Sequence, residues 1–118
     1  MPESDTRIVL QLVEGVMIVP FPDPVHDAFF SELRKSVLAY VHLHQISGLV
    51  LDLSAVELLD DHDFEMIRRV GVGVKLMGVS VVLAGIRPGA AAGLTMMDLE
   101  TCWADTALSV ESAMERFR

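Results

Sequence analysis

The fold is decided between Gly48 and Ala84, where the sequence reads GLVLDLSAVELLDDHDFEMIRRVGVGVKLMGVSVVLA. Residues 48–53 are a short apolar run without alternation, which is typical of a strand covered on both faces, and residues 79–84 repeat the pattern. Residues 61–77, between these runs, carry apolar side chains at helical spacing: Phe64, Ile67, Val70, Val74 and Met77. A strand, a helix and a second strand in this order predict two parallel strands joined by a right-handed crossover.

The segments before this unit predict a hairpin and a helix. Residues 7–12 and 16–19 are β-branched and apolar, and Glu14-Gly15 separates them, so we expect two antiparallel strands. Apolar residues then recur every three or four positions as far as residue 41. Asp23 followed by Pro24 is a typical cap and first helical residue, so this helix is predicted to begin at Pro24.

The segments after this unit complete an α/β domain. A short helix is predicted over residues 88–97, and a short strand is predicted to include Cys102 and Trp103. Ser109 is predicted to cap a last helix over residues 110–117. The order ββαβαβαβα predicts a single domain over residues 1–118, with a mixed β-sheet of about five strands and about four helices. The sheet is expected to begin with the antiparallel hairpin and continue with parallel strands.

Two glycines interrupt the helical pattern of residues 61–77. Gly71 and Gly73 each cost a helix interior about 1 kcal/mol relative to alanine. We therefore expect close packing at these positions to explain them.

Composition excludes several classes of function. The 118 residues are 52% apolar, so disorder is excluded, and 9 basic against 17 acidic side chains give a net charge of −8. No clustered basic face is present, so neither nucleic acid nor an anionic membrane is an expected partner. The single cysteine cannot form an internal disulfide and no secretory pattern is seen, which favours the cytoplasm. The apolar runs are far shorter than the ~20 residues that cross a bilayer.

Residues 57–65 hold five carboxylates and a histidine. Asp60, Asp61, His62 and Asp63 include ligand types that bind divalent metals. Four successive residues rarely converge on one ion, however, whereas acids are preferred at a helix N-terminus, where they interact with the dipole. The helix start is the favoured interpretation, and neither a metal nor a cofactor is predicted.

Other candidate motifs are incomplete. The turn at residues 85–89 joins a strand to a helix but lacks the ending of a phosphate-binding P-loop. Ser54 and Cys102 lie outside any nucleophile motif, and His42 and His44 are spaced so that they point to different faces of a helix. These observations favour a non-enzymatic interaction module over a catalyst.

Residues 49–61 and 82–95 together resemble the STAS domain family, the fold of bacterial anti-sigma-factor antagonists. Within that family they are most similar to the branch of the stressosome scaffold proteins RsbS and RsbR, and residues 106–113 resemble the final loop and helix of the same branch. The resemblance covers nearly the whole chain. It implies a fold rich in βαβ units, in agreement with the predicted order of elements.

The resemblance also implies two regulatory positions. The first is a serine or threonine that a kinase phosphorylates, next to a conserved aspartate at the start of the second helix. Here Asp60 matches that aspartate and Asp61 occupies the hydroxyl position. The second position, before the Gly-Ile of the fourth strand, is Ala84. Both acceptors are lost, and Asp61 is either a permanent partial mimic of phosphoserine or simply an acidic cap.

The implied function is a scaffold or regulator that self-associates and binds RsbR-like STAS proteins and an RsbT-like switch kinase. Such a pathway would control a sigma factor or a second-messenger enzyme. The contact is expected at the acidic helix start, formed by Asp60, Asp61, His62, Asp63 and Glu65. Two alternatives stay open: a simple antagonist that binds an anti-sigma factor, and a domain that binds a small ligand or nucleotide at the turn of residues 85–89.

Overall fold

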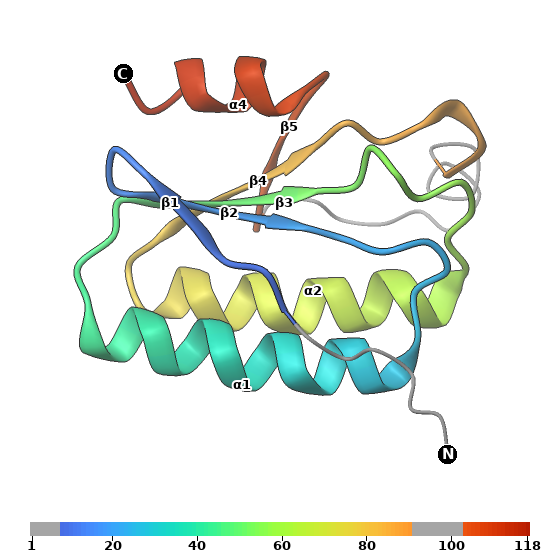
Figure 1. The fold of residues 1–118 in the computed structure, drawn as a ribbon, viewed down its shortest axis with the longest axis horizontal. Coiled ribbons are helices and arrows are strands. Elements are labelled where there is room, and N and C mark those ends of the chain that lie inside the picture. The colour runs from blue at the N-terminus through green and yellow to red at the C-terminus, as the bar shows by residue number, and fades with distance from the viewer. Residues whose placement is uncertain (1–7, 91–102) are drawn as a thin grey trace.

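A five-stranded sheet forms the middle layer of the computed structural model, which describes residues 8–90 and 103–118 (Figure 1). Its strands follow one another in space as they do in sequence: β1 (Gln11–Val13), β2 (Val16–Pro20), β3 (Gly48–Asp52), β4 (Ser80–Ala84) and β5 (Asp105–Ala107). β1 and β2 are antiparallel, and every later pair is parallel. The predicted fold class and the predicted N-terminal hairpin are confirmed.

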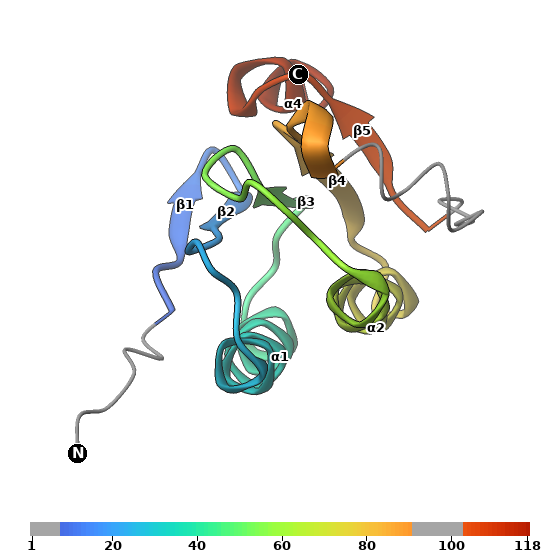
Figure 2. The same cartoon turned by 90° about the vertical axis from the view of Figure 1, so that its right-hand side faces the viewer.

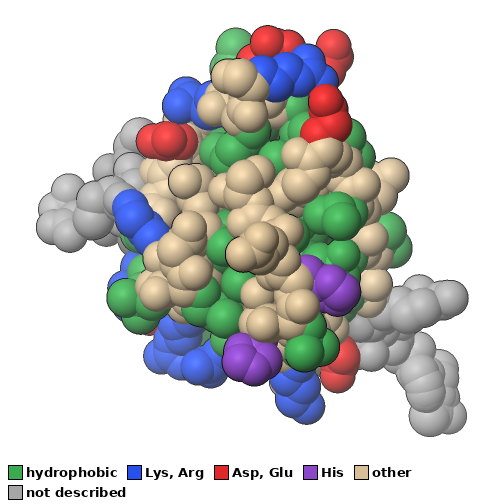
Figure 3. Space-filling view, turned by 90° about the vertical axis from the view of Figure 1, so that its left-hand side faces the viewer, with side chains coloured by type: hydrophobic (Ala, Val, Ile, Leu, Met, Phe, Trp, Pro, Cys, Tyr) green, Lys and Arg blue, Asp and Glu red, His purple; other side chains and the backbone are tan. Residues whose placement is uncertain are grey.

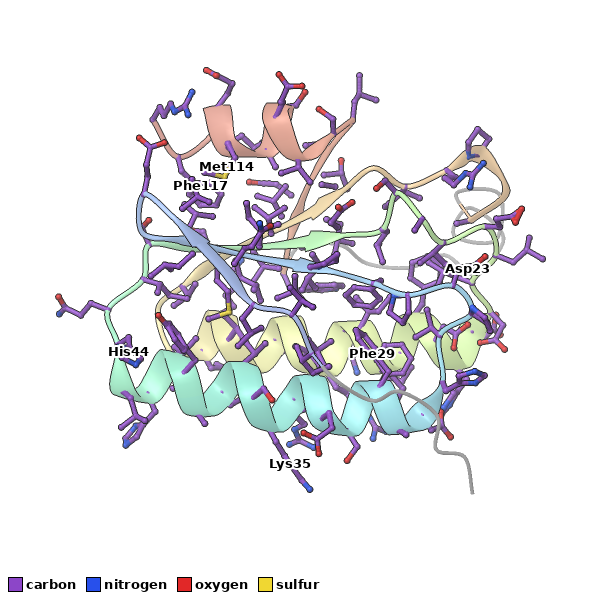
Figure 4. All side chains as sticks on the ribbon, in the orientation of Figure 1. Asp23, Phe29, Lys35, His44, Met114 and Phe117 are labelled. Carbon is purple, nitrogen blue, oxygen red and sulfur yellow. The ribbon has the colours of Figure 1, made fainter. Side chains whose placement is uncertain are left out.

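Helices cover both faces of the sheet. α1 (Asp27–Leu43) and α2 (Asp61–Leu76) lie on one face, and the short α4 (Val110–Glu115) lies on the other (Figure 2). Alternate strand residues therefore enter two separate cores. Leu49 and Leu51 pack toward α1 and α2, whereas Val50 packs toward α4. Met114 and Phe117 point from the α4 side toward the sheet, while Phe29 lies between α1 and the sheet (Figure 4).

Two predicted helices begin at the predicted residues, but the N-cap of α2 is Asp60, so the interpretation of Asp61 as an acidic cap is wrong. α2 starts at Asp61 after the N-cap Asp60, and α4 starts at Val110, where the Ser109 side chain accepts a hydrogen bond from the backbone N–H of Ser112 at 3.1 Å. These caps act between residues three apart, so the local sequence is sufficient to place them. Among the described residues, no helix is both long and apolar enough to span a membrane.

The predicted start of α1 at Pro24 is wrong, because the helix begins at Asp27 with His26 as its N-cap. Pairing continues beyond β2, since the N–H of Phe21 donates to the carbonyl of Asp52 at 2.9 Å. The segment that follows holds Pro22 and Pro24, and a residue that precedes proline disfavours helical geometry. The chain therefore does not become helical until it has crossed from the sheet to the helix layer.

Strand positions near the ends of the chain also differ from the prediction. β1 begins at Gln11 rather than near residue 7, and β5 begins at Asp105, so Trp103 precedes the strand. Trp103 is buried against α2, and this packing explains why an apolar residue precedes a polar edge strand. Residues 88–90 are helical, while the rest of the helix predicted over residues 88–97, together with Cys102, lies outside the described residues.

Close packing explains one of the two glycines in α2. The six-membered ring of Trp103 lies directly against Gly71, so a Cβ atom at this position would overlap the ring. Gly73 is different, because its nearest neighbour would be Leu38 Cδ2 at 3.6 Å, which is an ordinary contact. The packing explanation is confirmed for Gly71 and wrong for Gly73.

Candidate functional site

The candidate site lies at the carboxyl ends of the parallel strands, where α2 begins. The loops that follow β2, β3 and β4 all leave the sheet at this end (Figure 1). Such an edge is the usual place for recognition in open α/β sheets. Of the five predicted surface residues, Asp60 is the last residue of the loop after β3, and the other four lie in the first turns of α2.

Asp60 and Asp63 stabilise the start of the helix. Asp60 Oδ1 accepts a hydrogen bond from the Asp63 N–H at 2.8 Å, and Asp63 Oδ2 accepts one from the Asp60 N–H at 3.1 Å. The backbone hydrogen bond from Asp63 lowers the pKa of Asp60, whereas partial burial raises the pKa of Asp63. This reciprocal capping box uses both carboxylates in the fold itself.

His62 connects the two long helices. Its Nε2 lies 2.7 Å from Oδ1 of Asp27, the first residue of α1, and both side chains are exposed. The hydrogen bond to Asp27, together with the Asp27 charge, raises the pKa of His62. The two residues are 35 positions apart in sequence, so helical periodicity gave no signal for this contact.

Glu65 is bound by two arginines. Its carboxylate accepts hydrogen bonds from Arg68 at 2.9 and 3.0 Å and from Arg69 at 3.1 Å. These bonds lower the pKa of Glu65 to about 2. Because its charge is compensated within α2, Glu65 is a weaker candidate for attracting a basic partner than its sequence position indicated.

Asp61 differs from these neighbours. It is the first residue of α2 and it is exposed, and within residues 8–90 and 103–118 its carboxylate has neither a hydrogen-bond nor an ion-pair partner. Of the five predicted surface residues, it therefore presents a carboxylate that the fold leaves available.

The second predicted regulatory position, Ala84, is fully buried. It ends β4, pairs with Asp52 and Ala107, and packs in the core on the α4 side of the sheet. Gly85 follows with φ of +72°, and a Cβ there would lie 2.9 Å from the Cβ of Ser54. Asp61 belongs to the helix layer on the other face, so the structure does not bring the two positions together on one surface.

A groove at the carboxyl ends of the parallel strands was not anticipated. It has a volume of about 600 Å³ and is lined by residues of the three segments that follow β2, β3 and β4: Asp23, Pro24, Glu57, Leu58, Arg87, Pro88 and Gly89. Leu58 is 75% exposed, and the charged residues of the lining are Asp23, Glu57 and Arg87. The turn predicted as an alternative ligand site thus forms one wall of this groove. Among the described residues, no three His, Cys, Asp or Glu side chains are grouped so that they could hold a metal ion.

Comparison with known proteins agrees with the observed fold. A family model for the STAS domain matches residues 7–113. The RsbT co-antagonist protein RsbRD of Bacillus subtilis (strain 168) is 26% identical over 106 residues, or 90% of this chain, and the chain spans 38% of the length of that relative.

Two solved structures are similar over almost their whole length. A serine-to-glutamate variant of RsbS from Moorella thermoacetica has a TM-score of 0.81 at 24% identity, with 93% of each chain covered. A chain from the molecular architecture of the stressosome, a signal integration and transduction hub, has a TM-score of 0.80 at 26% identity, with 92% of this chain and 94% of that chain covered.

Proposed function

This chain belongs to the STAS domain family, and we propose that it is a non-enzymatic regulator that acts by protein–protein interaction in a stressosome-like partner-switching pathway. The similarity to RsbRD, a protein named as a co-antagonist of RsbT, supports this role, as does the similarity to a stressosome chain. The proposed partners are RsbR-like STAS proteins and an RsbT-like switch kinase. Recognition of either would use surfaces of a rigid domain rather than a catalytic group.

The available carboxylate of Asp61 is the observation that carries this proposal. It stands at the position where the family resemblance expects a phosphorylatable hydroxyl, at the exposed start of α2. An aspartate brings one negative charge, whereas a phosphoserine brings about −1.5 to −2 and three acceptor oxygens. Asp61 is therefore proposed to hold the chain in a fixed state that partly resembles the phosphorylated one.

The second position supports the same conclusion. Ala84 has no hydroxyl, and its burial would keep a kinase from reaching it in the folded domain. We therefore propose that the chain is regulated through its partners and not through its own phosphorylation.

Phosphorylation can be tested directly. The chain and an Asp61→Ser variant would each be incubated with an RsbT-like kinase and Mg-ATP, followed by intact-mass spectrometry. We expect no phosphate on the natural chain and one on the variant, since the serine restores the acceptor. A stoichiometric phosphate on the natural chain would contradict the fixed state, and an unmodified Asp61→Ser variant would show that residue 61 is not the acceptor position.

Partner binding can be tested by calorimetric titration with the same kinase. Asp61→Lys is expected to weaken binding at least about tenfold, or about 1.4 kcal/mol. Glu111→Lys, an identical charge change at an exposed residue of α4, is the matched control and should leave the affinity unchanged. Asp63 is unsuitable for this test because its substitution would break the capping box. Equal affinity of both variants would locate the contact elsewhere.

The size of the complex separates this role from that of a simple antagonist. Light scattering with an RsbR-like partner should detect a large assembly, because a scaffold protein would bind many copies of itself and of that partner. A small complex that forms only with an anti-sigma factor would favour the simple antagonist instead.

A further inference from the structure

Residues 22–28, which join β2 to α1, form a weakly anchored wall of the groove at the carboxyl ends of the strands. We call them the first wall. Asp23 and Pro24 of this segment line the groove (Figure 4). The first wall is exposed except for Val25, which is partly buried, and buried packing resumes only at Phe29. A segment with so few buried apolar contacts belongs to the part of a domain that opens most easily.

The other two walls of this groove are fixed more firmly. In the loop after β3, the exposed pair in the lining is flanked by Val56 and Leu59, which are both buried in the core. In the segment after β4, a Cβ atom at Gly89 would lie 3.1 Å from the carbonyl oxygen of Glu57, so the backbones of these two walls approach each other closely. The first wall is therefore the one whose position depends on a surface contact.

His62 supplies such a contact. Its Nε2 lies 2.7 Å from Oδ1 of Asp27, which belongs to the first wall, so this pair links the first wall to the first turn of α2. The charged groups that act on His62 are all carboxylates: Asp27 on α1, and Asp60 and Asp63 at the start of its own helix. The imidazole is therefore held between the starts of two helices by negative charge from both.

The other three histidines are placed differently. His42 and His44 lie at the far end of α1, and that end of the molecule shows its histidines among hydrophobic and uncharged side chains (Figure 3). His26 is the N-cap of α1, but its side chain makes no cap hydrogen bond. Within the part of the chain that the structure describes, only the His62 imidazole pairs with a carboxylate. A proton on His62 therefore alters a contact between two helices.

Protonation changes the strength of this contact. A protonated imidazole donates to a carboxylate in a charge-assisted hydrogen bond, which is roughly twice as strong as a bond between neutral groups. A neutral imidazole carries a single N–H, so Nε2 either donates without a charge or has no proton to donate. We propose that the His62–Asp27 contact is a pH-sensitive latch, which holds the first wall against the start of α2 when His62 is protonated and releases this side of the groove when the proton is lost.

The latch responds to pH in a defined direction. The hydrogen bond to Asp27 raises the pKa of His62 above its ordinary value of about 6.5. The contact is thus complete in mild acid and weakens as the pH rises through the folded value. Because both side chains are exposed, the contact contributes modestly, and the first wall should open up to about fivefold more often once the proton is lost.

The inference goes beyond the proposed function and is tested with the chain alone, by amide hydrogen exchange. The N–H groups of Phe29 and Phe30 donate to the carbonyl of His26 at 3.0 and 3.3 Å, so their protection reports opening of the first wall. Val37, in the buried middle of α1, is the reference for exchange from the rest of the helix. After correction for the intrinsic pH dependence of exchange, the protection of Phe29 and Phe30 relative to Val37 should fall by up to about fivefold between about pH 5.5 and about pH 8.5. The midpoint of this fall should coincide with the titration of His62 measured by NMR.

Matched variants identify the contact. Asp27→Asn and His62→Gln each remove the ion pair, so each should abolish the fall in protection. Asp61→Asn is the matched control, because it makes the same change at the first residue of α2, whose carboxylate has no partner among residues 8–90 and 103–118, and it should keep the fall. His26→Gln should keep the fall as well, because that imidazole takes no part in the contact. Circular dichroism would check that each variant is folded, and either Asp27→Asn or His62→Gln is sufficient for the test.

Several outcomes would overturn the latch. Protection that does not change with pH in the natural chain would do so, as would a midpoint that differs from the His62 titration. The proposal also fails if Asp27→Asn or His62→Gln retains the fall, or if Asp61→Asn loses it. None of these outcomes depends on whether a kinase binds Asp61, so a failure of the latch and a failure of the proposed function are distinguishable.

Discussion

Replacing the two glycines of α2 by alanine should have opposite effects on stability. Alanine is favoured over glycine in a helix interior by about 1 kcal/mol, so without other contacts both substitutions would stabilise the chain. At Gly73, the nearest atom to an added methyl group is Leu38 Cδ2 at 3.6 Å, and this ordinary contact leaves the gain intact. At Gly71, the methyl group would overlap the ring of Trp103, and overpacking of a core costs about 1–3 kcal/mol.

The expected net effects follow from these magnitudes. Gly73→Ala should raise the free energy of unfolding by up to about 1 kcal/mol. Gly71→Ala should lower it by up to about 2 kcal/mol, because a packing penalty of about 1–3 kcal/mol is only partly offset by the helical gain of about 1 kcal/mol. Urea unfolding followed by far-UV circular dichroism measures both values.

A double-mutant cycle tests the cause. In a Trp103→Leu background the bulky ring is gone, so Gly71→Ala should become neutral or stabilising. The reasoning is refuted if Gly71→Ala is as stable as Gly73→Ala, or if the cost of Gly71→Ala is the same with and without Trp103.

Three further results are expected at the start of α2. Asp60→Ala should lower the free energy of unfolding by about 1 kcal/mol in the same urea assay, because it removes the helix cap, while Asp61→Asn should leave it nearly unchanged. Asp27→Asn should move the pKa of His62, measured by NMR titration, down toward its ordinary value. Since the folded pKa of His62 is raised, the stabilisation from its bond to Asp27 is present below the unfolded pKa and is lost as the pH rises through the folded value. The stability difference between the natural chain and Asp27→Asn should therefore be larger at about pH 5 than at pH 8, and the opposite trend would contradict the contact.

The candidate site was predictable only in part. The sequence indicated where α2 begins and that acids gather there, because capping acts between residues three apart. It did not indicate which carboxylates remain available. Glu65 is bound by arginines of its own helix, a pairing that periodicity allows but does not require, and His62 reaches across to Asp27 on another helix. Of the five predicted surface residues, Asp61 is the one that is both exposed and without a partner among residues 8–90 and 103–118.

By itself, the sequence determined the α/β order, the parallel unit from β3 to β4, the start of α2 and the cap of α4. These features depend on hydrophobic periodicity and on hydrogen bonds between near neighbours, which are read along the chain. Tertiary structure alone decided the start of α1, the contact that excludes a side chain at Gly71, and the separation of Ala84 from Asp61 by the sheet. The physical reason is that each of these features depends on residues far apart in sequence, whose proximity is set by packing and not by local preference.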